Sequence, residues 1–256
     1  MTNQKTHNCL FCSLHYDGGN FCAKLSQDEI RDLNTHSKTI KVKRGETLPE
    51  DQLDRWPILT IESGVLSLQH LLHDGRRTIA AFFMRGDLLD LRGTNARNRG
   101  NLVALKTTKL CRLSNDVFER ILKTNEAARS VAWKCLTDQA FRATSHASDL
   151  AKKQALEKLA SFIFECRNRT ATEHPKDHAE IPVRRRDLAE YLGMQPETVS
   201  RSFKELEDRN IIRVSDLSIL KILDTPALRR IANGGRNPIG VGGHKGPDYK
   251  ILSASS

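Results

Sequence analysis

Three of the six cysteines in this 256-residue chain lie in one short stretch, CLFCSLHYDGGNFC, at residues 9–22. Cys9 and Cys12 form a Cys-x2-Cys pair, and Cys22 follows after nine intervening residues, just past a Gly-Gly step. The N-terminal residues are polar and lack the apolar core of a signal peptide, so we expect a cytoplasmic protein whose thiols stay reduced. In that compartment a cysteine cluster predicts a metal or redox site in preference to a disulfide framework.

A second stretch with recognisable chemistry, IPVRRRDLAEYLGMQPETVSRSFKELEDRNIIR, covers residues 181–213. Its pattern predicts a short helix capped by Gly193 and a second helix with Pro196 in its first turn, which is a helix-turn-helix. The buried face of the second helix is expected to consist of Val199, Phe203 and Leu206. Side chains suited to contacting bases and phosphates in the DNA major groove are Glu197, Thr198, Ser200, Arg201 and Lys204. A helical hairpin that binds nothing is the alternative interpretation.

The composition is that of a globular protein, with 38% hydrophobic and 28% charged residues. The longest apolar runs are far shorter than a membrane span, so we expect no membrane association. The net charge of +10 would suit nucleic acid, yet residues 181–220 carry equal numbers of basic and acidic side chains. Net charge therefore supports DNA binding only weakly, and the helix-turn-helix pattern is the stronger indication.

The sequence between these two stretches changes from strand-like to helix-like patterning. Residues 25–113 contain short apolar runs separated by glycine-containing turns, which predicts a compact antiparallel roll or barrel. Residues 114–169 contain no Gly or Pro and are rich in good helix formers, which predicts long helices. We expect a polar loop at 170–180 and a winged hairpin formed by 211–214 and 218–222.

The long helix carries a narrow stripe of apolar residues spaced four and three apart. This spacing is close to the seam of a coiled coil, and small residues in it allow two helices to approach closely. We therefore expect a homodimer interface, although packing against the chain's own domain would explain the same stripe. The residues of the stripe are Ala132, Leu136, Ala140, Ala143, Ala147 and Leu150.

The order of roll, long helix and helix-turn-helix resembles the Crp/Fnr family of bacterial transcription regulators over roughly residues 9–231. The turns KRGE at 43–46, IESG at 61–64, DGR at 74–76 and FMRGD at 83–87 are similar to those of the family's effector domain. The resemblance implies an α+β fold with an antiparallel β-roll of the cyclic-nucleotide-binding type, a dimerisation helix and a C-terminal winged helix-turn-helix. It also implies an activator with double-stranded DNA and RNA polymerase as partners, and no enzymatic activity.

Two segments indicate one branch of that family. The ETVSR sequence resembles the E-x-x-S-R recognition motif of the Fnr and FixK branches, which implies that Glu197, Ser200 and Arg201 recognise bases in a TTGAT-type palindrome. The cyclic-AMP-binding branch instead has Arg at the position of Pro196 and Gly at that of Ser200. The segment at 88–101 also lacks that branch's Gly-Glu-Leu and Arg-Ser or Arg-Thr elements, which argues against a cyclic nucleotide ligand.

The resemblance to Fnr-type sensors implies a four-iron, four-sulfur (4Fe-4S) cluster held by thiolates, which are soft ligands that suit iron. By that resemblance the cluster ligands are Cys9, Cys12, Cys22 and Cys111. A zinc ion held by the three N-terminal cysteines with Cys111, His7 or His15 is one alternative, and a thiol–disulfide switch is another. Cys135 and Cys166 lie in helical stretches and are expected to be small buried residues.

The whole pattern predicts a cysteine-rich sensory segment, a β-roll effector domain, a dimerisation helix, a winged helix-turn-helix domain and a flexible tail. Their expected bounds are 1–24, 25–124, 125–151, 152–231 and 232–256. The predicted function is an oxygen- or redox-responsive regulator that binds a palindromic operator as a homodimer. The alternatives are a regulator of this type with a zinc or thiol-switch site, and a metal-containing enzyme, for which the sequence offers no paired acid–base groups.

Overall fold

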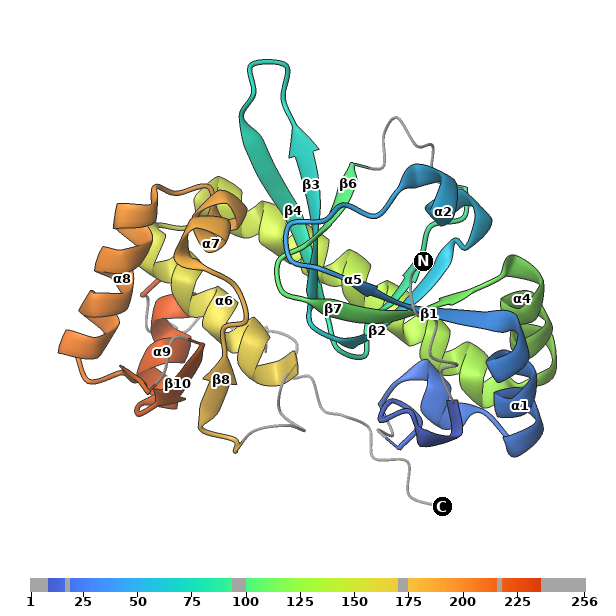
Figure 1. Cartoon of the computed structure of the whole chain (residues 1–256). Coiled ribbons are helices and arrows are strands. Elements are labelled where there is room, and N and C mark those ends of the chain that lie inside the picture. Colours follow the sequence, from blue (N-terminus) through green and yellow to red (C-terminus); the bar gives the residue numbers. More distant parts are fainter. Residues whose placement is uncertain (1–8, 17–18, 94–99, 170–174, 216–217, 236–256) are drawn as a thin grey trace.

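The structure is a computed structural model, and it describes residues 9–16, 19–93, 100–169, 175–215 and 218–235. Figure 1 shows a roll of strands with the N-terminal segment beside it, a smaller C-terminal domain, and one long helix that runs along both. That helix is α5 (Glu126–Lys152). The predicted α+β class and the predicted order of roll, long helix and helix-turn-helix are confirmed.

Two antiparallel sheets form the roll, with strand orders β1-β7-β2-β5 and β4-β3-β6. The side chains of Leu59, Leu66 and Leu110 are completely buried in the core of the roll. Gly64 makes the turn between β2 and β3 at φ +91°, and an added Cβ would lie 2.5 Å from the carbonyl oxygen of Thr107, so only glycine fits. The strands are β1 (Ser37–Val42), β2 (Ile58–Ser63), β3 (Val65–Leu71), β4 (Arg77–Met84), β5 (Leu88–Asp90), β6 (Asn101–Ala104) and β7 (Thr108–Leu113).

Two helices lie in the region where we expected strands alone. α1 (Gln27–His36) begins with a capping box, in which the Ser26 hydroxyl accepts from the Glu29 N–H and the Glu29 carboxylate accepts from the Ser26 N–H. The shorter α2 (Glu50–Arg55) follows the first strand. The prediction is wrong for these segments, because a Ser-x-x-Glu helix signal is only four residues long and strand-like runs follow it.

Three helices follow the roll, namely α4 (Asn115–Thr124), α5 and α6 (Ala155–Arg169). Side-chain caps set two of their starts, since the Ser114 hydroxyl accepts from the Val117 N–H and the Asn125 side-chain oxygen accepts from the Ala128 N–H. The prediction of long helices between residues 114 and 169 is therefore confirmed. Within the described ranges, no helix combines the length and the apolar character needed to cross a bilayer.

The C-terminal domain is a winged helix-turn-helix. Its three strands pair antiparallel in the order β8-β10-β9, so the predicted wing hairpin is confirmed as β9 and β10. The prediction of a loop at 170–180 is wrong at its C-terminal end, where the residues form β8 and pair with β10. Most of the predicted tail lies outside the described residues. The elements are β8 (His178–Glu180), α7 (Arg185–Leu192), α8 (Pro196–Asp208), β9 (Ile212–Val214), β10 (Ile219–Ile222) and α9 (Thr225–Ala232).

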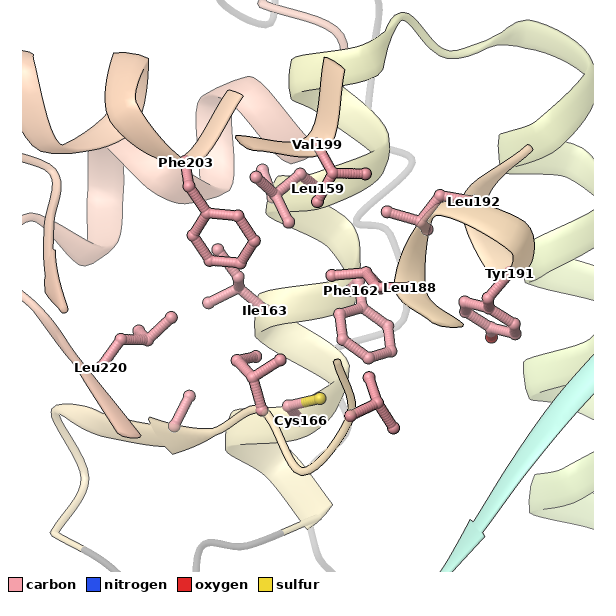
Figure 2. Packing of buried hydrophobic residues seen from close by; sticks show 14 of the residues in the cluster. Leu159, Phe162, Ile163, Cys166, Leu188, Tyr191, Leu192, Val199, Phe203 and Leu220 are labelled. Atoms are coloured by element: carbon pink, nitrogen blue, oxygen red, sulfur yellow. The ribbon is translucent and has the colours of Figure 1, made fainter. Parts of the chain in front are cut away.

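One apolar core fills the C-terminal domain and continues into the roll. Figure 2 shows side chains of α6 meeting those of α7, α8 and β10, namely Leu159, Phe162, Ile163, Cys166, Leu188, Tyr191, Leu192, Val199, Phe203 and Leu220. The same core includes Val65, Ile79 and Met84 of the roll, and the Phe82 ring packs against Tyr191 with centroids 4.6 Å apart. The helix-turn-helix therefore packs directly against the roll through apolar side chains.

Candidate metal centre and nucleic-acid interface

The N-terminal segment folds into two short 3-10 turns that carry cysteines, at Cys9–Phe11 and Phe21–Lys24. Asn20, which is only 3% exposed, organises the second turn. Its side-chain oxygen accepts from the Cys22 N–H at 3.0 Å, and its amide donates to the Leu14 carbonyl at 2.8 Å. These bonds close the loop back on itself and present Cys22 to the interior.

The four cysteines predicted as ligands line one pocket. The Cys9 N–H donates to Asn34 of α1 at 2.9 Å, which holds the first turn against that helix. Cys111 comes from β7, far along the chain, where β1 and β2 pair with it on either side. The pocket is lined by Cys9, Cys12, Leu14, His15, Cys22, Ile30, Leu33 and Cys111. We call this site the cysteine pocket.

All four thiols in the cysteine pocket are free and at most 8% exposed. Burial raises the pKa of each thiol, that of Cys111 to about 12 and that of Cys22 well above its ordinary value. Neighbouring thiols raise the pKa values of Cys9, Cys22 and Cys111 further, and every pair among the four interacts electrostatically, so they occupy one site. The thiols are therefore protonated at neutral pH, and a metal must displace their protons to bind.

The geometry of the pocket bears on which metal group it suits. A tetrahedral zinc site brings four ligands to within about 2.0–2.3 Å of one point. Among the described residues, no three His, Cys, Asp or Glu side chains are arranged to hold a single ion in that way. An iron–sulfur cube is wider, and each of its four thiolates binds a different iron atom. A group that binds one thiolate at each of several metal atoms does not require the four sulfurs to converge on one point.

The other predicted metal ligands and cysteines are placed less favourably. His15 lines the pocket, but its Nδ1 lies 3.2 Å from the Cys22 carbonyl oxygen and is engaged there. His7 lies outside the described residues. Cys166 is completely buried in the C-terminal core, as expected, whereas Cys135 on α5 is only partly buried. Neither of these two cysteines lines the cysteine pocket.

The helix-turn-helix has the geometry that the sequence predicts. Gly193 ends α7 at φ +62°, in the left-handed region, and its N–H donates to the Ala189 carbonyl. Pro196 lies in the first turn of α8. The predicted inner face of α8 is buried, and the side chains on its outer face are exposed except for the half-buried Thr198. We call the exposed set the recognition face: Glu197, Ser200, Arg201 and Lys204.

The apolar stripe on α5 divides between two environments. Ala132 is 2% exposed and packs with the core around the cysteine pocket, so its prediction as an interface residue is wrong. Leu136 is half-buried, while the rest of the stripe is exposed, namely Ala140, Ala143, Ala147 and Leu150. Trp133 and Phe141, which the stripe omits, are exposed on the same helix. An isolated chain thus leaves apolar side chains of α5 in water.

Ion pairs between the roll and the C-terminal domain were not predicted, because their partners lie far apart in the sequence. Arg77 of β4 donates to Glu190 of α7 at 2.5 and 2.8 Å and to Asp187 at 3.0 Å. Just past the other end of β4, Asp87 pairs with Arg169 of α6 and, at 3.4 Å, with Arg142 of α5. The Arg77 pairs fix the first helix of the helix-turn-helix to the roll, and the Asp87 pairs fix α5 and α6 to it.

Comparison with known families assigns both halves of the chain. Residues 157–231 match the Crp-like helix-turn-helix domain, and residues 39–125 match the cyclic nucleotide-binding domain. The nitrogen fixation regulation protein FixK of Bradyrhizobium diazoefficiens is 29% identical over 221 residues, which cover 84% of this chain and 90% of that protein. The transcriptional activator protein FnrA of Stutzerimonas stutzeri is 24% identical over 90% of this chain and 95% of that protein.

Solved structures show the same fold. The structure of FixK2 from Bradyrhizobium japonicum superposes with a TM-score of 0.65 at 23% identity, and it covers 76% of this chain and 96% of that one. A CooA mutant from Carboxydothermus hydrogenoformans gives a TM-score of 0.64 at 18% identity, covering 79% of this chain and 90% of that one. The roll and the winged helix-turn-helix are therefore found together in proteins of similar architecture.

Proposed function

Because the chain belongs to the Crp/Fnr family, in its Fnr/FixK-like branch, we propose that it is an oxygen-responsive regulator that senses through a 4Fe-4S cluster. The family membership makes it a DNA-binding transcription regulator. The observation that carries the oxygen-sensing proposal is the meeting of four buried thiols, from the N-terminal turns and from β7, around one pocket.

Cys9, Cys12, Cys22 and Cys111 would hold the cluster, which supplies a redox-active centre that molecular oxygen oxidises. The chain's own residues prepare the site for it. Leu14, Ile30 and Leu33 line the pocket and exclude water from the ligand sulfurs. Asn20 fixes the turn that presents Cys22, so this ligand is positioned before any metal arrives.

A direct contact links the cysteine pocket to the start of α5. The Asn125 side chain caps α5 through the Ala128 N–H, and its amide donates to the Lys24 carbonyl at 2.9 Å, in the turn that contains Cys22. Cluster binding favours conformations that gather the four cysteines. Those conformations also hold this turn against α5, so we propose that the cluster stabilises α5 for dimerisation.

Dimerisation would place two recognition faces on one duplex. The helix-turn-helix geometry puts them about 34 Å apart, one helical turn, on a palindromic site. Within each half-site, Arg201 would donate to guanine and Glu197 would accept from cytosine, in keeping with a TTGAT-type sequence. The recognition face is exposed and leaves these side chains available for that purpose.

Anaerobic reconstitution with ferrous iron and sulfide tests the proposal. We expect a brown protein with four irons and four sulfides per chain, and tighter binding to a TTGAT palindrome than to random duplex at one fixed salt concentration. Air should bleach the protein and weaken specific binding. Cys22→Ser and Cys111→Ser should prevent incorporation, whereas the matched control Cys135→Ser should keep it. Full incorporation in Cys111→Ser, or stoichiometric zinc that survives in air, would contradict the assigned cluster.

Charge reversal on α5 tests the dimer separately. Ala143→Glu would place like charges opposite each other across a two-fold seam, so the reconstituted variant should sediment as a monomer. Ser145→Glu is the matched control, because Ser145 is exposed on the same helix but about 200° around it from Ala143. If both variants stay dimeric, the chains associate through another surface.

A further inference from the structure

Two threonines flank Cys111 on the neighbouring strands. In the antiparallel registers, Thr39 of β1 and Thr60 of β2 both lie directly opposite Cys111 of β7. Residues directly opposite each other in such pairs project from the same face of the sheet, with Cβ atoms about 4.5–5.5 Å apart. The two threonine side chains therefore stand on either side of the Cys111 thiol, on the face that closes the cysteine pocket.

The hydroxyls of both threonines are buried and have no hydrogen-bond partner in the part of the chain that the structure describes. Thr60 is completely buried. Buried side-chain hydroxyls are nearly always paired, so each exception calls for an explanation. Thr108 shows the normal case on β7 itself: it is equally buried, and its hydroxyl donates to the Val65 carbonyl and accepts from the Val65 N–H.

The chemistry of the sulfur makes Cys111 a poor partner for these hydroxyls as a free thiol. A thiol is a weak hydrogen-bond acceptor, and Cys111 is a free cysteine in this structure. A metal-bound thiolate carries negative charge and accepts hydrogen bonds well. Valine would match the shape of threonine and suit a buried strand at least as well. A hydroxyl on both sides of one cysteine is therefore most useful when that cysteine becomes a strong acceptor.

We infer that Thr39 and Thr60 donate hydrogen bonds to the Cys111 sulfur when it is bound to the proposed cluster, an inference that rests on the proposed function. Hydrogen bonds to the sulfurs of an iron–sulfur centre stabilise its more negative, reduced form and so raise its reduction potential. Outer partners of this kind also hold a ligand in place. The two threonines are thus positioning residues that make the cluster harder for oxygen to oxidise.

Valine substitution removes the hydroxyl and keeps the shape. We expect Thr39→Val, Thr60→Val and the double variant to take up the same iron and sulfide as the wild type under anaerobic conditions. Their midpoint potential in a redox titration should shift to more negative values, and the half-life of the cluster absorbance in air should shorten several-fold, most in the double variant. Thr60→Ser, which keeps the hydroxyl, and the exposed control Thr78→Val should match the wild type.

Thermal unfolding of the metal-free proteins separates this role from a structural one. Removing an unpaired buried hydroxyl should leave the melting temperature unchanged or raise it. If Thr60→Val has a lower melting temperature than the wild type, the inference is tested with Thr39→Val, because Thr39 is only half-buried. Potentials and half-lives equal to the wild type in all valine variants would overturn the inference alone. A wild-type chain that takes up no cluster would overturn both this inference and the proposed function.

Discussion

The cysteine pocket and the recognition face differ in what they need to be complete. The recognition face consists of exposed polar side chains on one helix, and the opposite side of that helix is packed into a core. The cysteine pocket gathers side chains from several segments, its four thiols are buried, and two unpaired hydroxyls flank Cys111 on the neighbouring strands. The recognition face is therefore complete in the folded chain, whereas the cysteine pocket is completed by a bound ligand. Under the proposed function, a signal would enter at the pocket without any change to the side chains of the recognition face.

The two regions are nevertheless coupled through the roll. The core of the C-terminal domain continues into β3 and β4, and Arg77 ties β4 to α7. The cap at Asn125 ties the cysteine-bearing turn to α5. Substitutions at these contacts, and within each region, can therefore show whether folding of the DNA-binding domain and iron uptake by the cysteine pocket depend on each other.

Truncation of the α8 core should have the largest effect. Phe203 is 3% exposed, and Phe203→Ala should lower the free energy of unfolding of the C-terminal domain by about 3–5 kcal/mol, because it leaves a cavity. DNA binding should fail while iron uptake by the cysteine pocket persists, as measured by chemical denaturation and iron analysis. Lys204→Ala, at an exposed neighbouring position, should leave the unfolding transition in place. Loss of iron uptake in Phe203→Ala would show that the two regions fold as one unit.

Removal of one base contact should come next. Arg201→Ala should weaken binding to a TTGAT palindrome by roughly 1–3 kcal/mol, with a much smaller effect on random duplex, since its role is base recognition. Fluorescence anisotropy at one salt concentration measures both affinities. Arg209→Ala is the control, because Arg209 pairs with Glu205 at the far end of α8. An equal loss on both duplexes would make Arg201 a phosphate contact.

Breaking the link between the roll and α7 should have a moderate effect. Arg77→Met removes the cation from Asp187 and leaves Glu190 with its longer, 3.8 Å pair to the exposed Arg186. We expect a loss of about 1–2 kcal/mol in the free energy of unfolding, since the Arg77 side chain is 32% exposed and solvent screens part of the interaction. Thermal unfolding measures the loss. The neighbouring, exposed Arg76 pairs with Asp74 at the hairpin tip, so Arg76→Met should change little. Equal melting temperatures for the two variants would exclude a role for Arg77 in holding the C-terminal domain against the roll.

A pH effect at the α5–α7 contact should be the smallest. Burial lowers the pKa of His146, whose ring stacks on Tyr191 with centroids 3.8 Å apart. The unfolded chain then binds a proton more readily than the folded chain, so this contribution to stability should be fully present above about pH 6.5 and should decline as the pH drops toward the lowered pKa. His146→Phe should remove that part of the acid dependence of unfolding, and exposed His73→Phe should keep it. If both variants showed the same acid dependence of unfolding, the proton would be bound by a group other than His146.

Local signals account for what could be predicted of the DNA-binding domain. The glycine that ends α7, the proline that starts α8 and the four-and-three spacing of Val199, Phe203 and Leu206 act within one or two helical turns. Such signals depend on backbone geometry and on which side of a helix each residue occupies, and both follow from the order of residues. The capping box at Ser26 is a signal of the same kind and was overlooked.

The sequence by itself determined the helix-turn-helix, the recognition face and the three-cysteine stretch, because each depends on residues close together in the chain. Only the tertiary structure decided that Thr39 and Thr60 stand beside Cys111 and that Ala132 turns inward, and it brings Cys111 to the other three cysteines as the family resemblance implies. Strand register and helix packing set these contacts through many weak interactions between distant residues. A shift of one residue in register would turn both threonines to the other face of the sheet, and the sequence pattern alone carries no local mark of that choice.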